Sequence, residues 1–269
     1  MDSDRKLPRS DQLSLLLGVI LLAYALTPYV NISVNALVIR LFGAEFSFDF
    51  NFSSLMSLLI ALLAAAGSDW LLRNHPKYTP RVGLQHLIVP ALTAWLIGVP
   101  INNLQVNIQW WIVLFLGGIL LLLVYLAEYI AFDMHDVRHE AATLVLTAVS
   151  FALFLFLAVA VRTAGLRLYL AVPALSLSIF VFCLRSLFLK LNGRWLFHWA
   201  AVSALIIGQL VIGMHYWPIE PVKFGILLVG PAYGLTTYAS LVEEGIQWRS
   251  AMVEPLIMII LCVVLAVSL

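Results

Sequence analysis

The chain has 269 residues, of which 63% are hydrophobic and 11% are charged, and its formal net charge is +1. An ordinary soluble domain is about 45–50% apolar and about 25% charged, so this composition excludes a soluble globular protein. A net charge near zero gives no sign of a nucleic-acid partner, and none is expected.

Long apolar runs recur along the whole sequence. Each is long enough to cross a hydrocarbon core of about 30 Å as a helix, and none alternates in the manner of a membrane-barrel strand. The sequence therefore predicts an all-α, polytopic integral membrane protein with about nine transmembrane helices. We expect one transmembrane domain over residues 1–269, with a short N-terminal tail at 1–12 and no soluble domain.

The first half of the chain contains two irregular segments. A first helix is expected over residues 13–41, with a kink or break near Pro28. Residues 43–52 are expected to form an interfacial loop or half-helix. After a second helix over 53–72, residues 83–99 form a short apolar segment that contains Pro90, so this segment either spans the membrane or re-enters it.

The remaining apolar runs are more regular, and short polar turns separate them. Further helices are expected at 110–130, 139–161, 168–189, 196–216, 224–242 and 256–269. Cys183 and Cys262 both lie inside these runs, and their positions match no metal or disulfide spacing.

Orientation follows from the positively charged residues, which favour cytoplasmic loops. With nine spans, eleven of the fifteen lysines and arginines lie on the side of the N-terminus. If 83–99 re-enters instead, nine of the lysines and arginines lie on the side of the N-terminus and six on the other side. We therefore expect a cytoplasmic N-terminus and a C-terminus on the opposite side of a membrane of the bacterial cytoplasmic type.

The densest cluster of ionisable residues is the segment 128–140. His135 and His139 lie four residues apart and share one helix face, and Asp136 lies beside them. One interpretation is a transition-metal site with imidazole and carboxylate ligands. The favoured alternative is that Asp133 and Asp136 cap the helix that follows, in which case no cofactor is expected. The expected cytoplasmic end also gathers most histidines: His75, His86, His135, His139 and His198.

Four acids near helix ends are further candidates for function, because ionisable groups near membrane depth are costly. They are Asp69, Glu128, Glu243 and Glu244. Asp69 has ion-pair spacing to Arg73. Glu128 is the deepest and has few nearby partners in the sequence, so it is the first candidate for a proton or cation entrance.

The segment 230–240 combines small residues, a proline and hydroxyls. Gly230, Pro231, Gly234 and Thr237 either break the helix beside a cavity or permit close helix packing. Packing is the simpler interpretation.

No motif in the sequence identifies an activity: we find no phosphate-binding loop, nucleophile elbow or HExxH motif. Three hypotheses remain: a transporter or permease for a small solute or ion, a non-catalytic scaffold, and a metal-dependent membrane enzyme. We favour the first two over the enzyme. The expected partners are the lipid bilayer and other membrane proteins or further copies of this chain.

Overall fold

The computed structural model describes residues 8, 10–30, 37–41, 44–48, 52–73, 85–133, 136–191 and 193–269. The chain comprises two compact units, Met1–Asp133 (unit 1) and Met134–Leu269 (unit 2). The single transmembrane domain expected over the whole chain stays a prediction.

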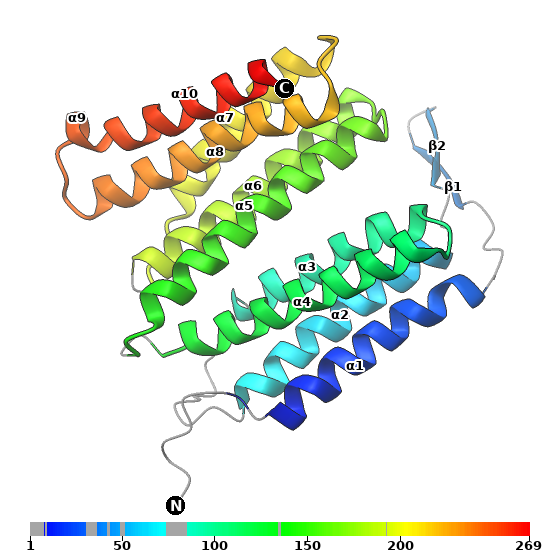
Figure 1. The fold of residues 1–269 in the computed structure, drawn as a ribbon. Helices are drawn as coiled ribbons and strands as arrows, with labels where there is room; N and C mark the ends of the chain where they lie inside the picture. Colours follow the sequence, from blue (N-terminus) through cyan, green and yellow to red (C-terminus); the bar gives the residue numbers. More distant parts are fainter. Residues whose placement is uncertain are drawn as a thin grey trace, which may run out of the picture. The chain divides into compact units, whose positions relative to one another are not determined.

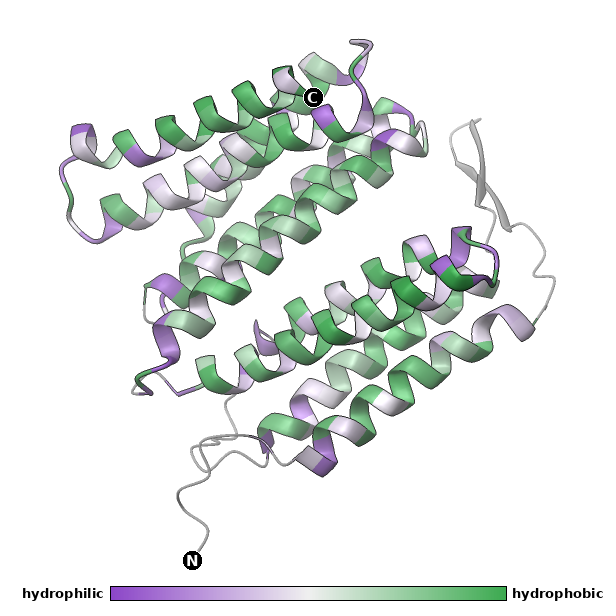
Figure 2. Cartoon of the chain, in the orientation of Figure 1, coloured by the Kyte–Doolittle hydropathy of each residue, from purple (hydrophilic) through white to green (hydrophobic). Residues whose placement is uncertain are grey.

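Eight helices in the described part of the chain are long and apolar enough to cross a membrane. Figure 2 shows hydrophobic residues along the helices and hydrophilic residues near their ends. Large apolar side chains remain exposed on these helices, and Leu62, Phe115 and Leu205 are each more than half exposed. Such faces are stable against lipid rather than water. The prediction of an all-α, multi-pass membrane protein is therefore confirmed.

Unit 1 is built on four helices, which lie side by side in Figure 1. They are α1 (Ser10–Leu26), α2 (Phe52–Arg73), α3 (Gln85–Asn103) and α4 (Ile108–Ala131). Two buried tyrosines connect them, because the Tyr24 hydroxyl donates to the carbonyl of Ala94 and the Tyr125 hydroxyl donates to that of Ala64. Both hydroxyls thereby satisfy a hydrogen-bonding group in an apolar interior.

The first predicted helix ends earlier than expected. After α1, the turn η1 (Thr27–Tyr29) contains Pro28, which confirms the break there. Strand β1 (Leu37–Leu41) then pairs antiparallel with β2 (Ala44–Phe48), so the expected continuation of the helix to residue 41 is wrong. The interfacial loop or half-helix expected at 43–52 is likewise a strand over Ala44–Phe48.

The short third segment forms helix α3, which runs antiparallel to both α2 and α4. Near one end, the Ser68 hydroxyl donates to the carbonyl of His86. Near the other end, the Asn102 amide lies 2.8 Å from the Ser57 hydroxyl, and the Trp110 indole N–H donates to the carbonyl of Ile101. These contacts show that α3 packs along both neighbours, but α3 is not among the eight helices that are long and apolar enough to cross a membrane, so its crossing stays a prediction.

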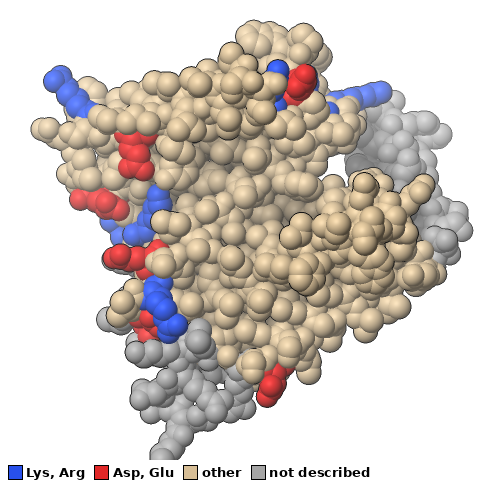
Figure 3. Space-filling view, in the orientation of Figure 1, with Lys and Arg blue, Asp and Glu red and all other residues tan. Residues whose placement is uncertain are grey.

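Unit 2 is organised around α8, which packs against α5, α6, α7 and α10. Its helices are α5 (His139–Thr163), α6 (Leu168–Lys190), α7 (Phe197–His215), α8 (Pro221–Glu243), α9 (Trp248–Ala251) and α10 (Val253–Ser268). On the face of unit 2 drawn in Figure 3, charged side chains gather near the helix ends.

The Arg162 side chain closes one end of unit 2. Its guanidinium donates to the carbonyl oxygens of His215, Trp217 and Ile219, which lie where α7 ends and the chain turns toward α8. The same group lies 5.3 Å from the ring centroid of Phe224. One cation thus satisfies several carbonyls that a helix end leaves without partners.

Candidate functional site

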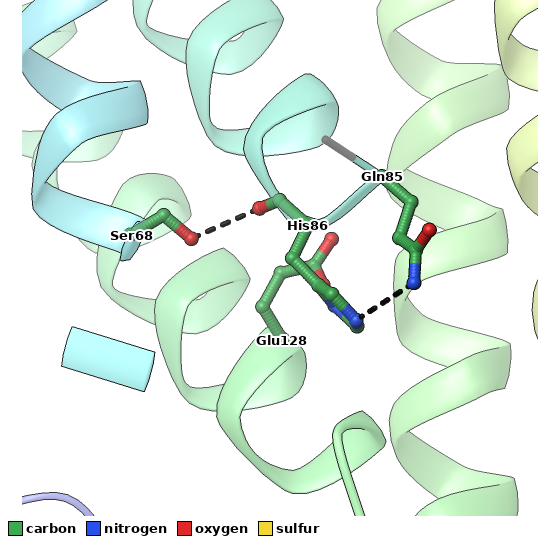
Figure 4. A network of polar contacts seen from close by, with 4 residues as sticks. All are labelled: Ser68, Gln85, His86 and Glu128. Carbon is green, nitrogen blue, oxygen red and sulfur yellow. Dashed lines mark hydrogen bonds and ion pairs between the residues drawn. The ribbon is translucent and has the colours of Figure 1, made fainter. Parts of the chain in front are cut away.

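A buried carboxylate and imidazole meet in unit 1. Glu128, in the last turn of α4, is 1% exposed, and His86, in the first turn of α3, is 5% exposed. The Nδ1 atom of His86 lies 2.9 Å from Oε2 of Glu128 (Figure 4). Antiparallel packing of α3 against α4 brings these two residues together although they are 42 positions apart.

The surrounding contacts hold the imidazole in place. Ser68 of α2 donates to the His86 carbonyl at 2.9 Å, which fixes the backbone of the histidine. The amide nitrogen of Gln85 lies 3.5 Å from Nε2 (Figure 4). The ring centroid of Phe132 lies 5.3 Å from that of the imidazole. The ring therefore has polar groups at both nitrogens and an aromatic side chain beside it.

This arrangement suits the binding and release of a proton. Imidazole and carboxylate are the side chains that exchange protons most readily near neutral pH once their surroundings are adjusted. A buried ionisable pair costs desolvation free energy, so apolar residues of similar volume often give equal or greater stability. Its presence in a membrane protein is accordingly a reason to look for function.

The sequence singled out Glu128 but missed its partner. Glu128 has few neighbours of opposite charge nearby in the sequence, whereas the fold supplies His86 from another helix. One signal was available, because the expected topology placed both residues at the cytoplasmic end of adjacent helices. No spacing rule connects residues that far apart.

The other predicted acids are placed differently. Asp69 forms the expected ion pair with Arg73 on the surface of α2, with 2.7 Å between Oδ2 and the guanidinium. Glu243 accepts from the Trp199 indole at 3.0 Å and lies 3.3 Å from Arg194. Glu244, which follows α8, is exposed and lines a cavity.

That cavity lies within unit 2 and has a volume of about 1020 Å³. Its wall combines charges of both signs with hydroxyl and apolar groups from α5, α6, α8 and α10. The side chains that line it include Asp136, His139, Glu140, Thr143, Thr147, Lys190, Tyr233, Glu244 and Met258.

Two of the three predicted metal ligands, Asp136 and His139, lie among the described residues. His135 lies outside the described residues. Asp136 accepts a hydrogen bond from the backbone N–H of Arg138 at 2.9 Å, and α5 begins at His139. Asp136 therefore satisfies an N–H at the start of the helix, a role that the sequence assigned first to Asp133. No group of three or more possible metal ligands occurs among the described residues.

Gly230 and Gly234 of α8 face α10. The helix continues through Pro231 from Pro221 to Glu243 and has no break. A Cβ atom on Gly230 would lie 2.8 Å from the Cβ of Cys262, and one on Gly234 would lie 3.3 Å from Ile259. Thr237 is buried, and its hydroxyl has no hydrogen-bond partner among the described residues.

Comparison with known families adds one finding. A family model described as "Protein of unknown function (DUF5656)" matches residues 32–269. The chain belongs to this family. No curated protein and no solved structure matched the chain.

The matched part of the DUF5656 member includes both features described above. The His86–Glu128 pair and the residues that line the cavity of unit 2 all lie within it.

Proposed function

We propose that this DUF5656 protein is a permease-like membrane protein for a small solute or ion, and that Glu128 and His86 exchange the coupling proton. The Glu128 carboxylate accepts a proton in the conformation in which the pair is open to water on one side of the membrane. It releases the proton in the conformation that is open to the other side. Between these two conformations the His86 imidazole shares the proton with the carboxylate, and its hydrogen bond keeps the carboxylate oriented.

The observation that supports this proposal is the burial of a complete acid–base pair in a multi-pass membrane protein. Glu128 is 1% exposed and lies 2.9 Å from an imidazole nitrogen. Asp69 and Arg73, by contrast, form a pair at the surface whose side chains are 35% and 64% exposed, so solvent screens it. Ionisable residues buried in membrane helices commonly mark ion and proton pathways.

The first test is proton flux into proteoliposomes that contain the full chain and a pH-sensitive dye. A potassium gradient with valinomycin drives the flux, and a mixture of amino acids and small cations is added as candidate solutes. We expect Glu128→Gln to lower solute-dependent flux by about tenfold or more, because the amide cannot carry the proton. His86→Gln should lower it less.

The matched control is Asp69→Asn, which removes a carboxylate from the surface of the same unit and should leave flux unchanged. Size-exclusion profiles and helical content must agree among the variants. Full flux in Glu128→Gln would refute the proton role. Wild-type protein without any flux would favour the scaffold hypothesis instead.

A further inference from the structure

The cavity of unit 2 has the features of a binding site. Its volume of about 1020 Å³ is at the upper end of the range for sites that hold small molecules. It differs from a simple group of acids, because a lysine, a histidine, a tyrosine and two threonines share its wall with the carboxylates.

One side of the cavity carries a positive charge. Lys190 ends α6, and its ammonium lies 5.7 Å from the ring centroid of Tyr233. Glu244 and Glu254 influence it electrostatically, but neither forms a salt bridge with it within the described part of the chain. A half-buried ammonium without an ion pair is a strong point of attraction for an anionic group.

Two buried polar groups in the wall have no hydrogen-bond partner among the described residues. The Thr147 side chain is 5% exposed, and its buried hydroxyl makes no hydrogen bond with any described residue. Nε2 of His139 lies 3.4 Å from the Thr143 hydroxyl, while its buried Nδ1 has no hydrogen-bond partner among the described residues. Buried polar groups rarely stay unsatisfied, so both indicate a polar ligand.

The opposite charge lies on other residues of the same wall. Glu140, in the first turn of α5, and Glu244, just after α8, are both exposed acids that line the cavity. Leu144, Ala148 and Met258 supply apolar surface between the polar groups.

We propose that this cavity binds a zwitterion, that is, a molecule with an anionic phosphate or carboxylate close to an ammonium group. Lys190 binds the anion, with hydrogen bonds from Thr147 and His139, and Glu140 and Glu244 bind the ammonium. The same chemistry occurs in free solutes and in the headgroups of zwitterionic lipids. Binding requires no flux, so this proposal and the permease proposal can fail separately.

The test measures binding to the purified full chain by the shift in its thermal midpoint, since a ligand that binds only the folded state stabilises it by an amount that grows with the ratio of ligand concentration to dissociation constant. In the free-solute arm the probes are O-phosphoethanolamine and glycine betaine, compared with ethanolamine and inorganic phosphate. In the lipid arm dihexanoyl-phosphatidylethanolamine is compared with dihexanoyl-phosphatidylglycerol. The arm that gives binding identifies the source of the ligand.

We expect a zwitterion in one arm to bind at least about tenfold more tightly than the probes with a single charge, because residues of both charges contribute to its binding. Lys190→Met should weaken binding by about tenfold, whereas Lys190→Arg should retain it. Lys223→Met is the matched control, since Lys223 pairs with Glu220 near the other end of α8 and does not line the cavity.

Glu244→Gln should remove the preference for the zwitterion over the anion, and Glu220→Gln should not. The proposal is overturned if no zwitterion binds in either arm, or if phosphate or phosphatidylglycerol binds as tightly as the zwitterion. Equal binding by Lys190→Met and Lys223→Met would also overturn it.

Discussion

At the scale of single residues, Arg162 shows how one side chain can secure a helix connection. Its guanidinium donates to three carbonyls between the end of α7 and the start of α8. Arginine suits this role because its donors are planar, numerous and always charged. Lysine could not reach three acceptors with the same geometry.

Replacing Arg162 with methionine should therefore lower the stability of the protein. Hydrogen bonds from a charged donor contribute about 1.5–3 kcal/mol each when buried, and partial exposure reduces this, so we expect a total loss of about 2–3 kcal/mol. Thermal unfolding in detergent would measure the change. Arg167→Met is the control, because Arg167 is exposed and makes no side-chain hydrogen bond within the described residues. Equal losses of stability in the two variants would contradict the role of Arg162 in securing the connection between α7 and α8.

At the scale of elements, the contact between α8 and α10 depends on the absence of a side chain at Gly230. An added methyl group would lie 2.8 Å from the Cβ of Cys262 and 3.4 Å from the Cα of Ile259. The first distance is too short for two carbon atoms, and the Cβ of Cys262 is bonded directly to the backbone, so the two helices would have to move apart.

We expect Gly230→Ala to cost about 1–3 kcal/mol through overpacking. Gly213→Ala, in α7, is the matched control, because nothing lies within 4 Å of its added Cβ. In that position alanine should be neutral or stabilise the helix by up to about 1 kcal/mol. The thermal midpoints of the two variants measure this difference in stability. A midpoint for Gly230→Ala at or above that of the wild type would refute the packing role of Gly230.

At the scale of the whole molecule, we predict nine crossings, which would place the two termini on opposite sides of the membrane. This prediction follows from the distribution of positive charge, and it counts α3 as a crossing in addition to the eight helices that are long and apolar enough to span a membrane. A C-terminal alkaline phosphatase fusion should be active, and a fluorescent-protein fusion at the same point should be dark. Fusions after Gly193 should give the reverse pattern. Fluorescence at the C-terminus would show that one crossing is missing.

Much of the fold was predictable because membrane helices are long and apolar, and because Pro28 and the Asp69–Arg73 spacing act locally. The strand Leu37–Leu41 was not predictable, because a short apolar run with β-branched residues fits the end of a helix equally well. The His86 partner of Glu128 depends on which helices are neighbours. The cavity also depends on which helices are neighbours, because α5, α6, α8 and α10 each contribute residues to it.

The position of Arg162 has a consequence for the order of events during synthesis. Its acceptors at His215, Trp217 and Ile219 follow it by 53 to 57 residues. A ribosome that adds about 5–20 residues per second needs several seconds to make that stretch. During this interval the guanidinium must be solvated by water or lipid headgroups, and α6 and α7 must insert before it finds its final partners. The end of unit 2 that Arg162 closes is therefore completed late, when the start of α8 has left the ribosome.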